Sequence, residues 1–301
     1  MLESGNVTIR QHFVPRVYLR GFSPEYIPCK RKKHKGVPFI WRYSVTDNEQ
    51  KMVPITSVCF DENIYEYTGK TGEVVLRNYL EKVLAQFESM FMEYRSKLEQ
   101  KVYCESNLST NCFLNKKEKD FWALYISQQI LRDPEVIEMA SELSREILNA
   151  SLTEKQSRNI ALSFCVPFLR EINENTEEAK ILSIIAAPMR DSDYHVLLDK
   201  EGGFVTARRP VYVEAKISPE KEVEYYDLVV FPISSQICLV LTKRKSKYFM
   251  NRLHIGNEMC RKDVLFWLSQ RNDEIFSNHE LSDKELAIIR GEETPLRFQE
   301  Y

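Results

Sequence analysis

The residues with the clearest chemical potential lie in a short, mostly apolar arm near the start of the chain. His12 and Arg16 flank Pro15 within residues 11–22, which read Gln-His-Phe-Val-Pro-Arg-Val-Tyr-Leu-Arg-Gly-Phe. An imidazole exchanges a proton near neutral pH, and a guanidinium binds phosphate or carboxylate groups. Because proline fixes its own φ and pushes the preceding residue toward extended geometry, we expect a pinned backbone here. A hydrogen-bonded packing role for His12 is the alternative.

Four further polar side chains lie on expected helices. Glu81 and Glu88 are seven residues apart, at the border of the apolar stripe of a helix expected over 73–102. Gln129 and Arg132 share a helix face just before a proline. A carboxylate can orient an imidazole, and an amide beside a guanidinium suits a phosphate. The alternatives are solvated ion pairs for the glutamates and, for the second pair, hydrogen bonds to backbone carbonyls that the proline frees.

We expect His12, Arg16, Glu88, Gln129 and Arg132 to face one pocket. In this hypothesis His12 is a general acid or base, Glu88 orients it, and Arg132 steadies the charge of a phosphorane. The catalytic residues would then be His12, Glu88 and Arg132. The side chains expected to bind substrate there are those of Arg16, Tyr18 and Gln129.

Two cationic runs provide a possible outer rim for that pocket. The first is Lys30-Arg31-Lys32-Lys33-His34-Lys35, and the second is Lys243-Arg244-Lys245-Ser246-Lys247. Point charges of this kind bind the phosphates of RNA or DNA without reading sequence. The residues expected to do so are Lys32, Lys33, Arg244 and Lys245, and the alternative is that both runs are solvated loops.

Hydrophobic periodicity and capping patterns predict a mixed architecture. Strands are expected over 39–43, 52–55, 194–198, 204–206, 211–213, 228–231 and 237–241. Helices are expected over 73–102, from Asn115 to a break at Pro134, from Asp133 through Ile147, after Thr153, over 181–186, over 248–271 and from Ser282 to Gly291. The fold class is therefore α+β, with a helical middle and small antiparallel sheets built from the N-terminal and C-terminal thirds. We expect one domain over residues 1–301, with two lobes, 1–190 and 191–301, as the alternative.

Composition limits the class of protein. The 301 residues are 43% hydrophobic and 29% charged, with a formal net charge of −2, which indicates a globular protein and excludes a wholly basic nucleic-acid coat. The seven cysteines are scattered without a Cys-x-x-Cys pair, so we expect a reduced, cytoplasmic protein. No signal-like start and no apolar run near the roughly 20 residues that span a bilayer are present, so no membrane partner is expected.

Familiar catalytic motifs are missing from the sequence. It contains no Gly-rich phosphate loop, no Gly-x-Ser-x-Gly elbow and no His-Glu-x-x-His. The histidines at 12, 34, 195, 254 and 279 include no pair at the spacing of a helical metal site. We therefore expect no metal and no cofactor.

The chain resembles a bacterial family catalogued as domain of unknown function 4238. The family's opening His-x-x-Pro-x-x-Tyr-Leu-x-x-Phe pattern is met by His12, Pro15, Tyr18, Leu19 and Phe22. Residues 63–65 match its Asn-x-Tyr segment, and Glu81 and Glu88 match its pair of helical glutamates. Residues 129–134 match its Gln-x-x-Arg-x-Pro motif, and residues 231–234 match its Phe-Pro-Leu-Ser motif. Members are associated with bacterial defence against phage, so the resemblance implies a context and no particular reaction.

The sequence departs from this pattern at one strand. The family usually reads Thr-Ser-Asp-x-Pro, whereas this chain reads Thr206-Ala207-Arg208-Arg209-Pro210. Any role of that aspartate as metal ligand or base in relatives therefore cannot be carried over.

Two functions remain open. The first is an anti-phage effector that acts on RNA or DNA by metal-independent, nuclease-like phosphodiester chemistry, with a histidine acid or base and arginine phosphate clamps. The second is a non-catalytic module that binds a phage protein, another phage component or a nucleotide through the same pocket.

Overall fold

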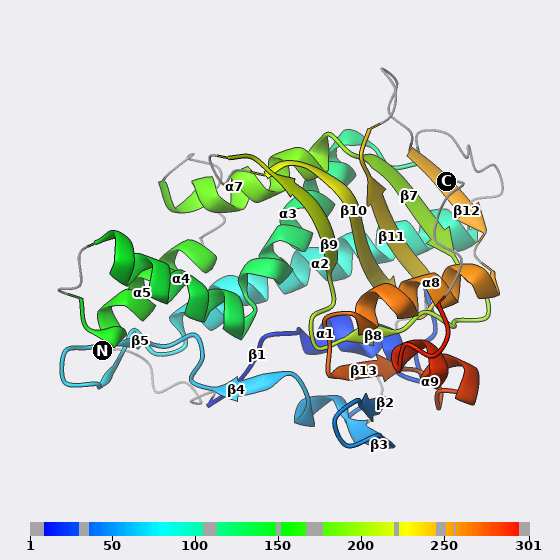
Figure 1. The fold of residues 1–301 in the computed structure, drawn as a ribbon, viewed down its shortest axis with the longest axis horizontal. Helices are drawn as coiled ribbons and strands as arrows, with labels where there is room; N and C mark the ends of the chain where they lie inside the picture. The colour runs from blue at the N-terminus through cyan, green and yellow to red at the C-terminus, as the bar shows by residue number, and fades with distance from the viewer. Residues whose placement is uncertain are drawn as a thin grey trace.

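The centre of the structure is a five-stranded sheet (Figure 1). The computed structural model describes residues 9–29, 36–104, 113–148, 152–166, 177–219, 223–244, 251–255 and 257–294. The strand order is β12 (Asn251–Ile255), β7 (Asp193–Leu198), β11 (Ile237–Thr242), β10 (Val223–Ser234) and β9 (Tyr212–Ile217). Neighbouring strands are antiparallel except β12, which runs parallel to β7. Strands β12 and β9 are therefore the two edges.

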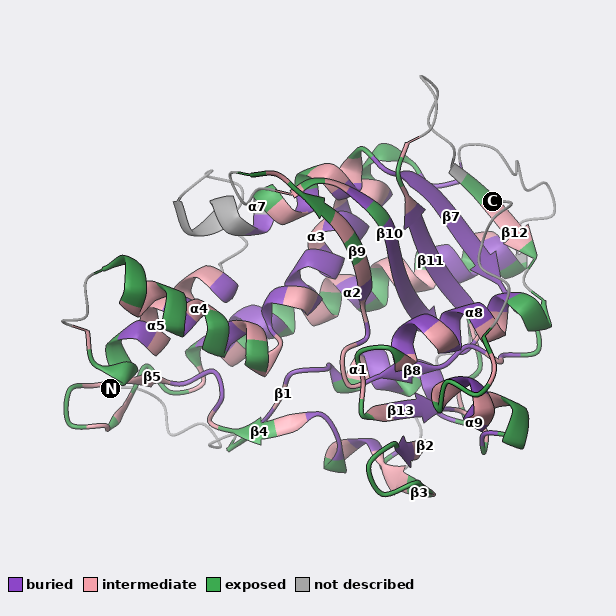
Figure 2. Ribbon diagram, in the orientation of Figure 1, coloured by how far each residue is buried: buried purple, intermediate pink, exposed green. Residues whose placement is uncertain are grey.

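The two faces of this sheet contribute to two separate cores. Val229 and Phe231 of β10 belong to the larger core, whereas Val230 between them belongs to the smaller one. This partition follows from the two-residue period of a strand, which sends successive side chains to opposite faces. Figure 2 accordingly shows β7, β11 and the second half of β10 as almost entirely buried. Nearly continuous apolar runs in these strands are what burial on both faces requires.

Helices cover both faces of the sheet. On the larger-core side, α7 packs against β10 and α3 packs against α7, while α8 and α9 pack on the other side with the smaller core. The helices are α2 (Tyr79–Cys104), α3 (Lys116–Leu131), α4 (Pro134–Ile147), α5 (Glu154–Cys165), α7 (Glu177–Arg190), α8 (Glu258–Ser269) and α9 (Asp283–Ile289). Capping boxes begin α3 at Asn115, α5 at Thr153 and α9 at Ser282.

The N-terminal third joins the C-terminal third through a second sheet. Its four strands lie in the order β3 (Glu49–Pro54), β2 (Phe39–Ser44), β13 (Glu274–Ser277) and β8 (Thr206–Ala207). The remaining short elements are β1 (Arg10–His12), α1 (Arg16–Leu19), the 3-10 helices η1 (Arg20–Phe22) and η2 (Ile55–Ser57), β4 (Phe60–Glu62), β5 (Tyr67–Thr68) and β6 (Val74–Val75). Strand pairing thus ties together segments more than two hundred residues apart in sequence, β2 with β13.

The structure confirms the α+β class and the expected hairpin, and it corrects two helices. The helix expected over 73–102 begins only at Tyr79, because Val74–Val75 pair with Tyr67–Thr68 and Leu76 takes a positive φ of 52°. The helix expected over 248–271 is wrong at its start, since Asn251–Ile255 form β12 and the helix begins at Glu258. Pairing with β7 outweighs the helical pattern there.

Two further features bear on the class of protein. None of the helices in the described ranges is both long and apolar enough to cross a membrane. Cys59, Cys165 and Cys238 are buried, free thiols.

Candidate functional site

The N-terminal arm is pinned as an extended segment. Strand β1 pairs antiparallel with β4, which places His12 opposite Phe60. The side chain of Gln11 is fully buried: its Oε1 accepts from the backbone N–H of Tyr65 at 2.7 Å, and its Nε2 donates to Glu66 at 2.8 Å. Pro15 then precedes the first turn of α1. Backbone pairing on one side of His12 and a proline turn on the other hold its Cα in place.

His12 is a neutral imidazole with a free lone pair. Its ring hydrogen-bonds the backbone of Thr56, and its Nε2 is buried with no hydrogen-bond partner in the described part of the chain. We place the ring proton on Nδ1, toward Thr56, which leaves the acceptor lone pair on Nε2. Burial, then the positive charges of Arg16 and Arg132, lower the pKa of His12 to about 4. At neutral pH the ring is uncharged.

Arg132 connects the arm to two other elements. It is 1% exposed, and its Nη2 donates to the backbone carbonyl of His12. Its Nε lies 3.4 Å from the hydroxyl of Tyr65, which in turn donates to the Arg132 carbonyl at 2.8 Å. Its Nη1 lies 3.7 Å from Oε1 of Glu88. A buried guanidinium needs such partners, because leaving it unpaired costs several kcal/mol.

Two carboxylates and one further cation complete the group. Burial raises the pKa of Glu81, while Arg132 and Arg16 lower it and Glu88 raises it further. The side chain of Glu88 is 27% exposed, and Arg16 is exposed on α1. Arg16 acts electrostatically on both His12 and Glu81. We name this group the Arg132 cluster, comprising His12, Arg16, Tyr65, Glu81, Glu88 and Arg132.

The other expected site residues lie elsewhere. The ring of Tyr18 is fully buried, and its hydroxyl lies 2.8 Å from Oγ1 of Thr206 and donates to the carbonyl of Pro232 at 2.7 Å. Gln129 lines a different cavity, of about 400 Å³, between α3, α4, α7 and β9. Lys32, Lys33 and Lys245 lie outside the described residues. Arg244 is half-buried just after β11.

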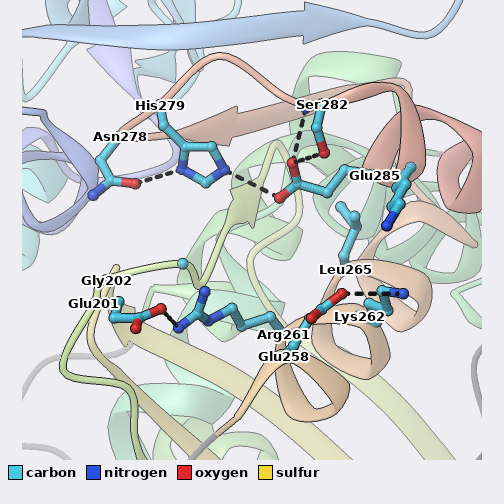
Figure 3. A pocket seen from close by; sticks show the side chains of 12 residues that line it. Glu201, Gly202, Glu258, Arg261, Lys262, Leu265, Asn278, His279, Ser282 and Glu285 are labelled. Atoms are coloured by element: carbon cyan, nitrogen blue, oxygen red, sulfur yellow. Dashed lines mark hydrogen bonds and ion pairs between the residues drawn. The ribbon is translucent and has the colours of Figure 1, made fainter.

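The structure contains a second cavity, of about 360 Å³, that the sequence did not predict (Figure 3). On one wall His279 lies between two acceptors, with Nδ1 2.8 Å from Oδ1 of Asn278 and Nε2 3.1 Å from Oε1 of Glu285. On the other wall Arg261 makes an ion pair with Asp199 at 2.6 Å. Burial raises the pKa of Glu285, but hydrogen bonds from His279 and Ser282 lower it to about 2. His279 and Arg261 therefore each already have a carboxylate partner.

Two histidines meet on neighbouring strands. Nδ1 of His195 on β7 lies 3.1 Å from Nε2 of His254 on β12. The sequence could not indicate this pair, because its second member falls in a segment with a helical pattern. Among the described residues, no group of three or more His, Cys, Asp or Glu side chains is arranged to hold a metal ion.

Comparison with known proteins identifies a family without a described reaction. Residues 10–273 match a family model described as "Protein of unknown function (DUF4238)". Neither a curated protein nor a solved structure matches the chain. The Arg132 cluster lies within the matched segment, whereas His279 and Glu285 follow it. The cluster is therefore the candidate site that belongs to the shared part of the chain.

Proposed function

Because the chain belongs to the family described as protein of unknown function (DUF4238), a description that names no reaction, we propose its function from the Arg132 cluster. The proposed function is that of an anti-phage effector that cleaves RNA without a metal ion, with His12 as general base. The defence setting rests on the family resemblance of the sequence. The chemistry rests on one observation, the unpartnered Nε2 lone pair of a neutral His12 beside Arg16.

RNA is the substrate class that this geometry suits best. Nε2 of His12 removes the proton of a ribose 2′-hydroxyl, and the 2′ oxygen attacks the adjacent phosphorus. The bond from phosphorus to the 5′ oxygen of the next nucleotide breaks, and that oxygen takes a proton from water. The products are a 2′,3′-cyclic phosphate and a 5′-hydroxyl. DNA lacks the 2′-hydroxyl and so lacks the internal nucleophile.

The arginines have two roles in this proposal: Arg16 binds the phosphate, and the charges of Arg16 and Arg132 lower the pKa of His12. The exposed guanidinium of Arg16 is the group available to a phosphate, since that of Arg132 already bonds His12, Tyr65 and Glu88. A bound phosphate offsets the positive charges that lower the pKa of His12, so this pKa should rise toward its ordinary value when substrate binds. The base would then be strongest in the complex. Because Nε2 is buried, a substrate hydroxyl reaches it only after a neighbouring side chain moves.

Binding without turnover is the second candidate function. The observation that favours it is Arg208, whose guanidinium carbon lies 5.1 Å from the ring centroid of Phe13, the residue after His12. In the family pattern that the sequence resembles, the position of Arg208 carries an aspartate. A cation in place of an anion beside the arm strengthens polyanion binding and removes one possible acid or base.

A chimeric substrate tests the proposal. A labelled DNA strand with one ribonucleotide should be cut at that residue in the presence of chelator, with a 2′,3′-cyclic end, and the all-DNA strand should stay intact. His12→Asn, which keeps a donor toward Thr56, should abolish cleavage, and Arg16→Gln should weaken binding. Arg77→Gln, at an exposed position outside the cluster, is the matched control.

The alternative outcomes separate the two candidates. Saturable RNA binding that Arg16→Gln weakens, with no cleavage by the parent protein, would replace catalysis by binding. Full activity of His12→Asn, or equal cutting of the all-DNA strand, would reject His12 as the base.

A further inference from the structure

The edge strand β9 has one free side. In the described part of the chain its hydrogen-bonded neighbour is β10, and no strand lies on its other side. An edge strand presents unpaired backbone N–H and C=O groups that can pair with another strand. Proteins usually protect such edges with bulges, prolines or a covering element. The register shifts of this pair lie on the β10 side, at Val223/Tyr225 and Tyr226/Leu228, so β9 itself stays regular.

The two faces of β9 differ in character. Val213, Ala215 and Ile217 line the cavity between β9 and α4, and Ile217 is 52% exposed. Glu214 and Lys216 point to the opposite face and are exposed. The strand therefore alternates an apolar row with a row that holds one negative and one positive charge.

This alternation is self-complementary in one antiparallel register. If two copies of β9 pair about a twofold axis through Ala215, Glu214 of each copy lies opposite Lys216 of the other. On the other face, Val213 then lies opposite Ile217. Directly opposed residues of an antiparallel pair interact, and opposite charges or apolar pairs stabilise the pairing. Shifting the axis by one residue removes the charge match, because Val213 would then lie opposite Ala215 and Tyr212 opposite Lys216.

The adjoining helix offers more apolar surface on the same side. Met139 of α4 lines the cavity with Val213 and Ile217. Met139, Leu143 and Ile147 follow each other at intervals of four and are 59%, 52% and 68% exposed. Side chains at this spacing form one stripe along a helix. An exposed apolar stripe beside an open strand edge is typical of a protein interface.

We propose that the protein forms a twofold symmetric dimer through β9, in which the two five-stranded sheets join into one. Such a contact is isologous, so the same patch serves both copies and the assembly closes at two. Backbone hydrogen bonds supply part of the affinity, and the alternating side chains set the register. This inference does not depend on the chemistry proposed for the Arg132 cluster.

Reversing the charge of Glu214 or of Lys216 tests the proposed pairing register of the two β9 strands directly. The parent protein should show a dimer mass at tens of micromolar in light scattering after gel filtration. Glu214→Lys and Lys216→Glu each create two like-charge pairs across the twofold axis and should each raise the dimer dissociation constant by on the order of tenfold or more. An equimolar mixture of the two variants should dimerise again, because every cross-strand pair then joins opposite charges.

Further variants keep the test decisive. The double variant Glu214→Lys/Lys216→Glu should restore the homodimer, whereas Ile217→Lys should leave a folded monomer, since it places a charge opposite Val213. Glu142→Lys, at an exposed position on α4 away from the cavity lining, is the control for net charge and should stay dimeric. Circular dichroism checks that each variant is folded. A monomeric parent, or a mixture of the two single variants that stays monomeric, would overturn the proposal.

Discussion

The guanidinium of Arg132 donates a hydrogen bond to the backbone carbonyl of His12, across 120 residues of sequence. The same guanidinium contacts Tyr65 and Glu88, so one buried side chain at the end of α3 positions the arm, the loop after β4 and helix α2. His12 is thus held through its main chain by an arginine, while its ring keeps an unpartnered Nε2. The backbone carbonyl of His12 thus fixes the position of the residue, while Nε2 of its ring is the atom available for chemistry.

Loss of Arg132 should destabilise the protein strongly. Arg132→Ala leaves the buried carbonyl of His12 without its partner and removes the contacts of the guanidinium with Tyr65 and Glu88, and we expect a loss of about 3–5 kcal/mol in the free energy of unfolding. Arg77→Ala, at an exposed position, should change it by less than about 0.5 kcal/mol. Urea denaturation measures both. Equal stability of the two variants would contradict the connecting role of Arg132.

The stability of the protein should depend on the protonation of His12. Its folded-state pKa of about 4 lies below its ordinary value of 6.5, so the unfolded chain binds more protons between these values. Stability is therefore fully present above pH 6.5 and is lost as the pH falls toward 4. The loss is at most about 3 kcal/mol and smaller where solvent screens the partly exposed ring.

Denaturation of the parent and of His12→Asn between pH 4 and 7 measures this contribution. The difference in unfolding free energy between the two proteins should shrink as the pH falls. A difference that stays constant over this range would show that the histidine titrates normally in the folded state.

The two cationic runs should bind polyanions without sequence preference. Replacing Lys32, Lys33, Arg244 and Lys245 by glutamine should weaken RNA or DNA binding and reduce the slope of log affinity against log salt by about 0.7 to 0.9 for each phosphate that the protein no longer neutralises. The melting temperature should be nearly unchanged. Fluorescence anisotropy at several salt concentrations measures the slope, and an unaltered slope would identify the runs as solvated loops.

The chain should unfold as one unit. Because β2 pairs with β13 and Tyr18 hydrogen-bonds Thr206 and Pro232, the N-terminal third cannot separate without breaking its bonds to the C-terminal third. We expect coincident transitions by circular dichroism and by tryptophan fluorescence. Two resolved transitions would favour the two-lobe alternative. Measurement well below the dimer dissociation constant removes any contribution from association.

Local patterns were sufficient where the interacting groups are close in sequence. The capping boxes at Asn115, Thr153 and Ser282 need only a partner three residues away, and each is present. The β2–β3 hairpin likewise needs one turn. The apolar periods of α2 and of β10 with β11 indicated the elements, because burying a stripe or a face is the main driving force that a short window records.

Only the tertiary structure decided which of these elements meet. Residues 251–255 carry a helical pattern but form a strand, because β7 offers them backbone partners that lie more than fifty residues away. Gln129 and Arg132 share a helix face, yet Arg132 contacts the arm and Gln129 lines the cavity beside β9, since three residues of helix are enough to reach different neighbours. The sequence determined the kinds of side chain available, whereas the free lone pair of His12 and the free edge of β9 depend on contacts between distant segments.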